Sequence, residues 1–219
     1  MLTYEQVLKS ETIKTYITRA DESLITLGFT EHSFSHVIHV ATTAGYILEE
    51  LGYDARTIEL AKIAGYMHDI GNLVNRKDHS QSGAVMAWSI LNDMGCDPGE
   101  IATIVTAIGN HDEGTGVPVN AVAAALILAD KADVRRSRVR NKDVSTFDIH
   151  DRVNYSVKES KLSINADKST ITLVLTVDTQ YGSVMDYFEI FLNRMLLCRK
   201  AAERLDLQFT LTINNQSVI

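Results

Sequence analysis

The chain places histidines and aspartates where side chains from several predicted helices could meet. Histidine nitrogens and carboxylate oxygens bind divalent iron, manganese, cobalt, nickel or zinc more readily than magnesium, which prefers all-oxygen shells. A bound ion of this class turns water into a nucleophile near neutral pH. The residues whose types and positions predict such a site are His36, His68, Asp69, His79, His111 and Asp130.

The adjacent pair His68-Asp69 is the centre of this candidate site. A carboxylate beside a histidine can bridge two ions while flanking histidines bind one ion each, so the set could hold two ions. We therefore expect His68 and Asp69 to carry catalysis. The two cysteines, Cys96 and Cys198, have apolar neighbours and no partner at metal-ligand spacing, which predicts core positions and neither a disulfide nor a structural zinc site.

Helices inferred from hydrophobic periodicity would position these residues. The predicted helices span residues 34–51, 55–70, 81–94, 98–108 and 119–136. Residues 109–118 form the predicted loop before the last of them. Gly52, Gly71 and Gly95 follow three of these helices, where left-handed C-caps are expected. Asp97 and Pro98 have the residue types expected at the N-cap and the first position of the helix that follows them.

The pattern changes after about residue 140. Apolar and polar residues alternate at 162–164 and at 171–177 on either side of a turn-like NADKS segment, which predicts a hairpin. They alternate again at 209–213, which predicts a final strand. Between them, residues 187–205 form one long predicted helix that is apolar on more than one face.

Together these elements predict a mainly α fold. We expect a helical domain at residues 1–145 and a small α/β appendage at residues 146–219 that contains the hairpin, the long helix and the final strand. The apolar faces of the long helix must pack against other residues to be removed from water. A homodimer and burial against the small sheet explain these faces equally well.

The composition narrows the class of protein. The chain has 219 residues, of which 45% are hydrophobic and 22% charged, as in an ordinary globular protein. Its net charge of -7 disfavours broad binding to nucleic acid backbones but is compatible with a small phosphorylated ligand. The longest apolar run, residues 119–129, is about half of a membrane span, and the first residues lack the pattern of a signal peptide. We therefore expect a cytoplasmic location and no membrane contact.

Three segments resemble the H…HD…D signature of the HD superfamily of phosphohydrolases. They are HVIHVATTAGYILEELG starting at His36, LAKIAGYMHDIGN ending at Asn72, and ILADKAD starting at Ile127. The resemblance covers about residues 31–140 and implies an HD-domain helical bundle. It also implies that the metal ligands include His36, His68, Asp69 and Asp130.

Two further histidines resemble those that bind a second metal in binuclear branches of the superfamily, such as the HD-GYP cyclic-dinucleotide phosphodiesterases. They are His79 in HSQSG and His111 in NHDEGTG. The chain departs from HD-GYP proteins because the loop at 114–118 lacks their tyrosine, while Asn72 and Asn110 replace a lysine and a histidine. The resemblance therefore implies two ions but neither a third ion nor cyclic-dinucleotide specificity. The acid pair of the alarmone hydrolases is also missing after His68-Asp69.

Basic residues close to the candidate site could bind phosphate. The cluster that follows Asp130 contains Lys131, Arg135, Arg136, Arg138 and Arg140. These cations either stabilise a helix C-terminus and face solvent, or they capture phosphate, which arginine binds in bidentate fashion. Arg76 and Lys77, in the loop before His79, are rival candidates. The predicted substrate-binding residues are thus Lys131, Arg135, Arg76 and Lys77, while His32 and His39 are expected to pack or to orient a ligand.

The resemblance implies a metal-dependent hydrolase of a phosphate ester or phosphoanhydride that acts on a small, nucleotide-like substrate through a metal-activated water. Two alternatives stay open. An HD-type di-iron oxygenase would use the same kind of ligand set. A regulatory module would bind a nucleotide or a partner without converting it.

Overall fold

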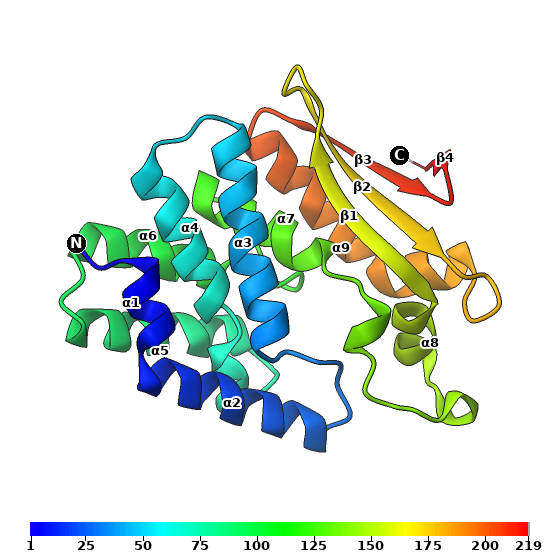
Figure 1. Ribbon diagram of the computed structural model, residues 1–219, viewed down its shortest axis with the longest axis horizontal. Helices are drawn as coiled ribbons and strands as arrows, with labels where there is room; N and C mark the ends of the chain where they lie inside the picture. The colour runs from blue at the N-terminus through cyan, green and yellow to red at the C-terminus, as the bar shows by residue number, and fades with distance from the viewer. Residues whose placement is uncertain (219) are drawn as a thin grey trace.

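The computed structural model describes residues 1–218 and has a helical bundle on one side and a layer of sheet and helix on the other (Figure 1). The bundle contains α1 (Tyr4–Lys9), α2 (Glu11–Thr26), α3 (Phe34–Glu50), α4 (Ala55–Met67), the 3-10 turn η1 (Ile70–Leu73), α5 (His79–Asp93), α6 (Pro98–Gly109) and α7 (Ala121–Ala132). Two 3-10 turns, η2 (Arg136–Arg138) and η3 (Val144–Thr146), lead to α8 (Ile149–Ser156). The mainly α fold with a C-terminal α/β appendage is confirmed.

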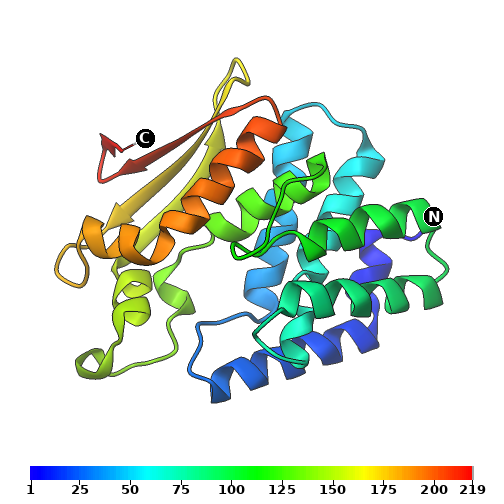
Figure 2. The ribbon, with the colours of Figure 1, turned by 180° about the vertical axis from the view of Figure 1, so that it is seen from behind.

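Helix α7 lies at the centre of the molecule. Every residue from Val122 to Ala132 is buried, and most of them are alanine, leucine or isoleucine. The short alanine side chains let α3, α4 and α6 pack against one side of α7, while α9 (Val184–Arg204) packs against the other (Figures 1 and 2). Because helices pack on both sides of α7, its two charged residues, Asp130 and Lys131, lie in the interior among apolar neighbours.

The C-terminal sheet has the strand order β1-β2-β3-β4, with β1 (Val157–Ile164), β2 (Thr170–Val177), β3 (Gln208–Ile213) and β4 (Gln216–Ser217). Strands β1 and β2 form the predicted antiparallel hairpin, whereas β2 and β3 are parallel and joined through α9. Alternate residues of β2 are buried, and α9 covers one face of the sheet (Figure 2). One apolar face of α9 thus packs against α7 and the sheet of the same chain, whereas Leu192 and Leu196 on the helix stay exposed.

Glycines end two helices as predicted, but Gly71 has a different role. Gly52 and Gly95 adopt left-handed φ angles of 82° and 72°. The left-handed conformation predicted for Gly71 is wrong, because this glycine lies inside η1. A Cβ atom on Gly71 would lie 1.9 Å from the carbonyl oxygen of His79, so the glycine is needed for the close approach of η1 to α5.

Several predicted helix boundaries are wrong by a few residues. The helix predicted at 55–70 ends at Met67, and the next helix begins at His79 instead of residue 81. The helix predicted at 119–136 spans Ala121–Ala132, because the chain leaves the helical conformation at Asp133. The carboxylate of Asp133 there accepts hydrogen bonds from His36 and Arg135, which fixes the break.

The remaining composition-based expectations concern cysteines and membranes. Cys96 and Cys198 are buried and unpaired among the described residues, as expected for core positions. Burial raises the pKa of the Cys198 thiol to about 12, so this side chain is a neutral core residue. No helix in residues 1–218 combines the length and the apolar character that a membrane crossing requires.

Candidate metal centre

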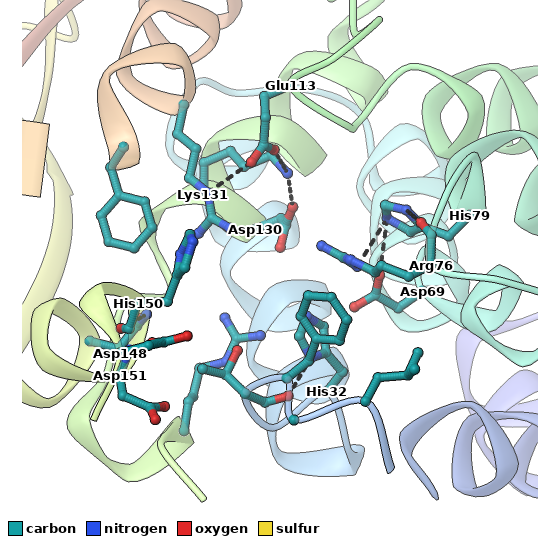
Figure 3. Close-up of a pocket in the computed structure, with 18 of the residues that line it drawn as sticks. His32, Asp69, Arg76, His79, Glu113, Asp130, Lys131, Asp148, His150 and Asp151 are labelled. Carbon is teal, nitrogen blue, oxygen red and sulfur yellow. Dashed lines mark hydrogen bonds and ion pairs between the residues drawn. The ribbon is translucent and has the colours of Figure 1, made fainter. Parts of the chain in front are cut away.

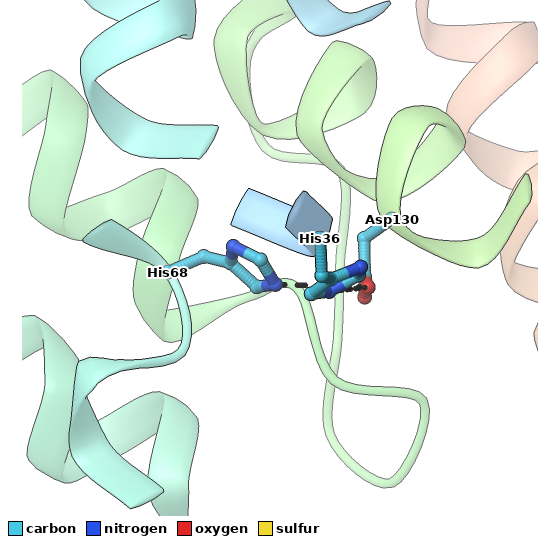
Figure 4. Close-up of side chains that lie close together, drawn as sticks. All are labelled: His36, His68 and Asp130. Carbon is cyan, nitrogen blue, oxygen red and sulfur yellow. Dashed lines mark ion pairs between the residues drawn. The ribbon is translucent and has the colours of Figure 1, made fainter. Parts of the chain in front are cut away.

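The structure brings all six predicted ligand residues together beside α7. They come from α3 (His36), the end of α4 (His68 and Asp69), the start of α5 (His79), the loop after α6 (His111) and α7 (Asp130). Each is at most 9% exposed, although each has a polar side chain. Figure 4 shows the side chains of His36, His68 and Asp130 pointing toward one another. Such burial is costly unless the polar atoms find partners.

The first group of ligand atoms consists of two histidine nitrogens and two carboxylate oxygens. His36 Nε2 lies 3.5 Å from Asp69 Oδ2 and 3.4 Å from Asp130 Oδ1. His68 Nε2 lies 3.2 Å and 3.6 Å from the same two oxygens. Two atoms bound to one ion at about 2.0–2.2 Å are about 3–3.5 Å apart. These separations therefore fit four atoms that share one ion.

Hydrogen bonds outside the centre fix which nitrogen of each histidine carries the proton. The acceptors of the Nδ1 hydrogens are Asp133 Oδ2 for His36 (2.7 Å), the Gly65 carbonyl for His68 (2.7 Å), the Arg76 carbonyl for His79 (3.0 Å) and the Ile108 carbonyl for His111 (2.6 Å). Because carbonyl and ionised carboxylate oxygens only accept, each ring carries a proton on Nδ1 and directs its Nε2 atom into the centre. Among the described residues, His36 Nε2, His68 Nε2 and Asp69 Oδ2 have no hydrogen-bond partner.

A second group of ligand atoms faces the other oxygen of Asp69. His79 Nε2 lies 3.1 Å from His111 Nε2 and 3.5 Å from Asp69 Oδ1. Two nitrogen lone pairs at this separation repel each other unless a cation lies between them. Asp69 Oδ1 also accepts a hydrogen bond of 2.9 Å from Asn72 Nδ2, which fixes the orientation of the carboxylate. The residues therefore fit divalent ions on both sides of Asp69.

Electrostatics favour positive charge at the centre. Burial disfavours a charged His68, but the carboxylates of Asp69 and Asp130 outweigh burial and raise the pKa of His68 to about 10. Burial also works against ionisation of Asp69, yet nearby histidines, His68 foremost, hold its pKa well below the usual range. For His79 and His111, burial prevails and lowers the pKa, so both rings stay neutral. The ionised Asp69 and the neutral His79 and His111 are thus in the forms that bind metal ions, whereas an ion bound at the centre would take the place of the proton that the raised pKa keeps on His68.

The centre opens into a cavity of about 430 Å³ (Figure 3). One wall carries Asp69, His79, His111 and Asp130, and cations stand beside it. The facing wall consists of polar residues of α8 and its N-cap, which are Asp148, His150, Asp151 and Asn154. Leu27, Phe29 and Phe191 supply the apolar part of the lining. A molecule of small-metabolite size therefore has access to the candidate metal centre.

The structure places two of the four predicted substrate-binding residues in this cavity. Lys131 lines it, with its ammonium 2.7 Å from Asp130 Oδ2, and Arg76 lines it with its guanidinium over the Phe29 ring. Arg135 and Lys77 are not among the described residues that line the cavity. Arg135 instead pairs with Asp133, and Lys77 is exposed.

The other arginines of the basic cluster hold separate segments of the chain together. Arg136 stacks on Tyr155, Arg138 donates to the carbonyl oxygen of Glu31, and Arg140 pairs with Asp21. Arg138 also lines the cavity. The cluster is therefore a set of individual contacts and not one continuous phosphate-binding surface.

Sequence reasoning missed several residues around the centre. Asp133, which orients His36, lies within the ILADKAD segment, so its spacing from Asp130 could have identified it. His32 lines the cavity, whereas His39, expected to pack or to orient a ligand, is 44% exposed and lies 4.0 Å from Asp133. Glu113 and Arg194 also line the cavity. No sequence signal points to Arg194, because it is far along the chain from the motifs.

Comparison with known proteins supports the same assignment. The sequence profile of the HD domain matches residues 33–152, which extends from the start of α3 into α8. Curated relatives include Ribonuclease Y of Bacillus pumilus, 28% identical over 117 residues, which cover 53% of this chain and 21% of the relative. Ribonuclease Y of Thermosipho melanesiensis is 33% identical over 119 residues, with the same shares covered. The chain thus spans about a fifth of the length of these relatives.

A solved structure described as a predicted HD superfamily hydrolase, from an uncultured Thermotogales bacterium, is also similar. It is 26% identical, with a TM-score of 0.45, and the match covers 57% of this chain and 67% of that one. The family assignment rests on the sequence profile, which matches more than half of the chain. This protein therefore belongs to the HD-domain family.

Proposed function

We propose that the chain hydrolyses a phosphoester or phosphoanhydride bond in a small, nucleotide-like substrate with the help of two divalent ions. The observation that carries this proposal is the position of Asp69, which lines the cavity and whose two oxygens face two separate groups of histidine Nε2 atoms. The residues that would hold the first ion are His36, His68, Asp69 and Asp130. Those that would hold the second are Asp69, His79 and His111.

When bound, such ions supply Lewis-acid activation of water and of phosphoryl oxygens. The chain itself orients the ligands: Asn72 holds the Asp69 carboxylate, and Asp133 holds the His36 ring. The cations of Lys131 and Arg76 line the cavity beside the centre, where they can bind the negative charge of a phosphate group. Catalysis of phosphoryl transfer depends mainly on such positioning and charge.

Two observations support a nucleotide-like substrate. The cavity combines the aromatic rings of Phe29 and Phe191 with cations and with the polar wall of α8, so it can accommodate a flat apolar group as well as phosphate. The curated relatives are named Ribonuclease Y, and a ribonuclease acts on phosphodiester bonds between nucleotides. The overall charge of -7 favours a small substrate over a long nucleic acid.

The test is the turnover of bis(p-nitrophenyl) phosphate by chelator-treated protein and by the same protein reloaded with Mn²⁺. We expect turnover only after reloading, and a loss on the order of a thousandfold or more in Asp69→Ala. The matched control is Asp93→Ala, which removes an exposed carboxylate at the end of α5 and should retain full activity. Turnover that does not depend on metal, or that survives in Asp69→Ala, would contradict the proposal.

A further inference from the structure

Glu113 lies between two cations at the edge of the metal centre. It follows His111 in the loop between α6 and α7. Its Oε2 atom is 2.6 Å from the ammonium of Lys131, and its Oε1 atom accepts a hydrogen bond of 3.0 Å from Arg194 Nε (Figure 3 shows the Lys131 contact). Each oxygen of the Glu113 carboxylate therefore faces one cation.

Arg194 reaches this position from α9, in the C-terminal appendage. Its guanidinium stacks on Phe191, 4.5 Å from the ring centroid, and its side chain is 23% exposed. An arginine has five N–H donors, and Glu113 uses only Nε. Among residues 1–218, neither terminal nitrogen of Arg194 makes a hydrogen bond. The two terminal nitrogens of this cavity-lining residue are thus free to donate in parallel, the arrangement that binds phosphate in bidentate fashion.

Lys131 connects this region to the metal centre. Its ammonium lies 2.7 Å from Asp130 Oδ2 and 2.6 Å from Glu113 Oε2. A single ammonium group therefore separates the Glu113 carboxylate from a predicted metal ligand. An anion bound at the position of the Glu113 carboxylate would therefore lie next to a phosphate group bound at the metal centre.

We propose that Arg194 and Lys131 form a subsite for a second phosphate group, adjacent to the one that is cleaved. The carboxylate of Glu113 occupies this subsite in the ligand-free chain and leaves when the second phosphate binds. The substrate class is then a compound with two neighbouring phosphate groups. This inference rests on the proposed function and deepens it, because it gives the C-terminal appendage a direct part in substrate binding.

The subsite can be tested by binding, without turnover. Calorimetric titration of the metal-loaded, full-length chain would use methylenediphosphonate, which carries two phosphonate groups and resists hydrolysis, and methylphosphonate, which carries one. We expect Arg194→Gln to weaken methylenediphosphonate binding by about tenfold or more and to change methylphosphonate binding little. We expect Glu113→Gln to tighten methylenediphosphonate binding, because the internal competitor has lost its charge.

The control is Arg199→Gln, which removes an exposed arginine from the same helix and should bind both probes as the wild type does. Arg194→Lys serves as a second variant and should retain part of the affinity if Arg194→Gln fails to fold. The proposal is overturned if both Arg194→Gln and Glu113→Gln weaken binding, because the pair would then be only a structural contact. It is also overturned if Arg194→Gln binds methylenediphosphonate normally. Turnover of bis(p-nitrophenyl) phosphate, which has one phosphate, tests the proposed function separately.

Discussion

The helical bundle and the C-terminal appendage contribute to the same cavity in different ways. In the bundle, His68, His79 and His111 each donate Nδ1–H to the carbonyl oxygen three residues earlier, so their orientation is set within one turn of chain. The appendage contributes Phe191 and Arg194, which reach the cavity only because α9 packs against α7. The difference indicates that local structure orients these three candidate metal ligands, whereas packing between distant segments forms the wall of the cavity that would hold a substrate.

The largest expected effect tests whether the bundle alone holds the metal. We expect two equivalents of transition metal per chain in the wild type, loss of most metal in Asp69→Ala, and loss of about one equivalent in His111→Ala, because Asp69 faces both groups of ligand atoms and His111 only one. Metal content measured by mass spectrometry of protein purified without chelators checks this.

The matched control comes from the opposite wall of the same cavity. His150 lies on α8 and lines the cavity, but it is not one of the ligand residues. His150→Ala should therefore keep the wild-type metal content. Metal loss in this variant would mean that α8 takes part in metal binding, and the contrast between the two regions would fail.

The next effect concerns the rigid contact between η1 and α5. Gly71→Ala should lower the free energy of unfolding by about 3 kcal/mol or more, because the new Cβ would overlap the backbone of His79. Gly109→Ala is the control, since a Cβ there would meet its nearest neighbour at an ordinary 3.6 Å. Chemical denaturation of both variants provides the measurement. Equal stability of the two would show that η1 can move away from α5 at little cost.

A smaller effect is expected where the bundle relies on a side chain to orient a histidine. Asp133→Asn keeps an acceptor for His36 Nδ1 but removes the charge, and we expect metal affinity to fall by about 10–100-fold. Competition with a fluorescent chelator would measure this. His39→Gln should have no such effect, although His39 is also near Asp133, because its ring is half exposed. Unchanged affinity in Asp133→Asn would mean that packing alone holds His36.

The smallest expected effect concerns the contact of Arg136 with the C-terminal appendage. Arg136 stacks on Tyr155 at 4.4 Å and on Tyr181 at 5.4 Å, so Arg136→Gln should lower the free energy of unfolding by about 1 kcal/mol. Metal content should stay at the wild-type level, because Arg136 is not among the described residues that line the cavity. Thermal unfolding and metal analysis of one preparation test both statements. A loss of metal would show that this contact between Arg136 and the appendage supports the metal centre.

The bundle could be predicted from the sequence because its signals are local. Hydrophobic periodicity and the caps at Gly52, Gly95 and Asp97 indicated the helices. The motifs then indicated which histidines and aspartates are candidate metal ligands. Helix ends were less accurate. The break at Asp133 depends on its partners His36 and Arg135, one of which is distant in sequence.

The walls of the cavity could not be predicted, because they depend on tertiary contacts. Arg194 and Phe191 look like ordinary residues of an amphipathic helix until α9 is placed against α7. The same holds for α8, an eight-residue helix whose polar residues give no sign of the cavity until the helix is placed in the fold. Of the predicted phosphate-binding residues, Arg135 illustrates the limit, since its pairing with Asp133 removes it from the cavity.

The anchors of the histidine rings have a consequence for how this protein tolerates mutation. Three of the four acceptors are main-chain carbonyls, which no amino-acid substitution can delete. Neighbouring positions can therefore vary in sequence while these three imidazoles keep the same proton placement. Asp133 is the exception, and it makes His36 the ring most vulnerable to a single change in the gene.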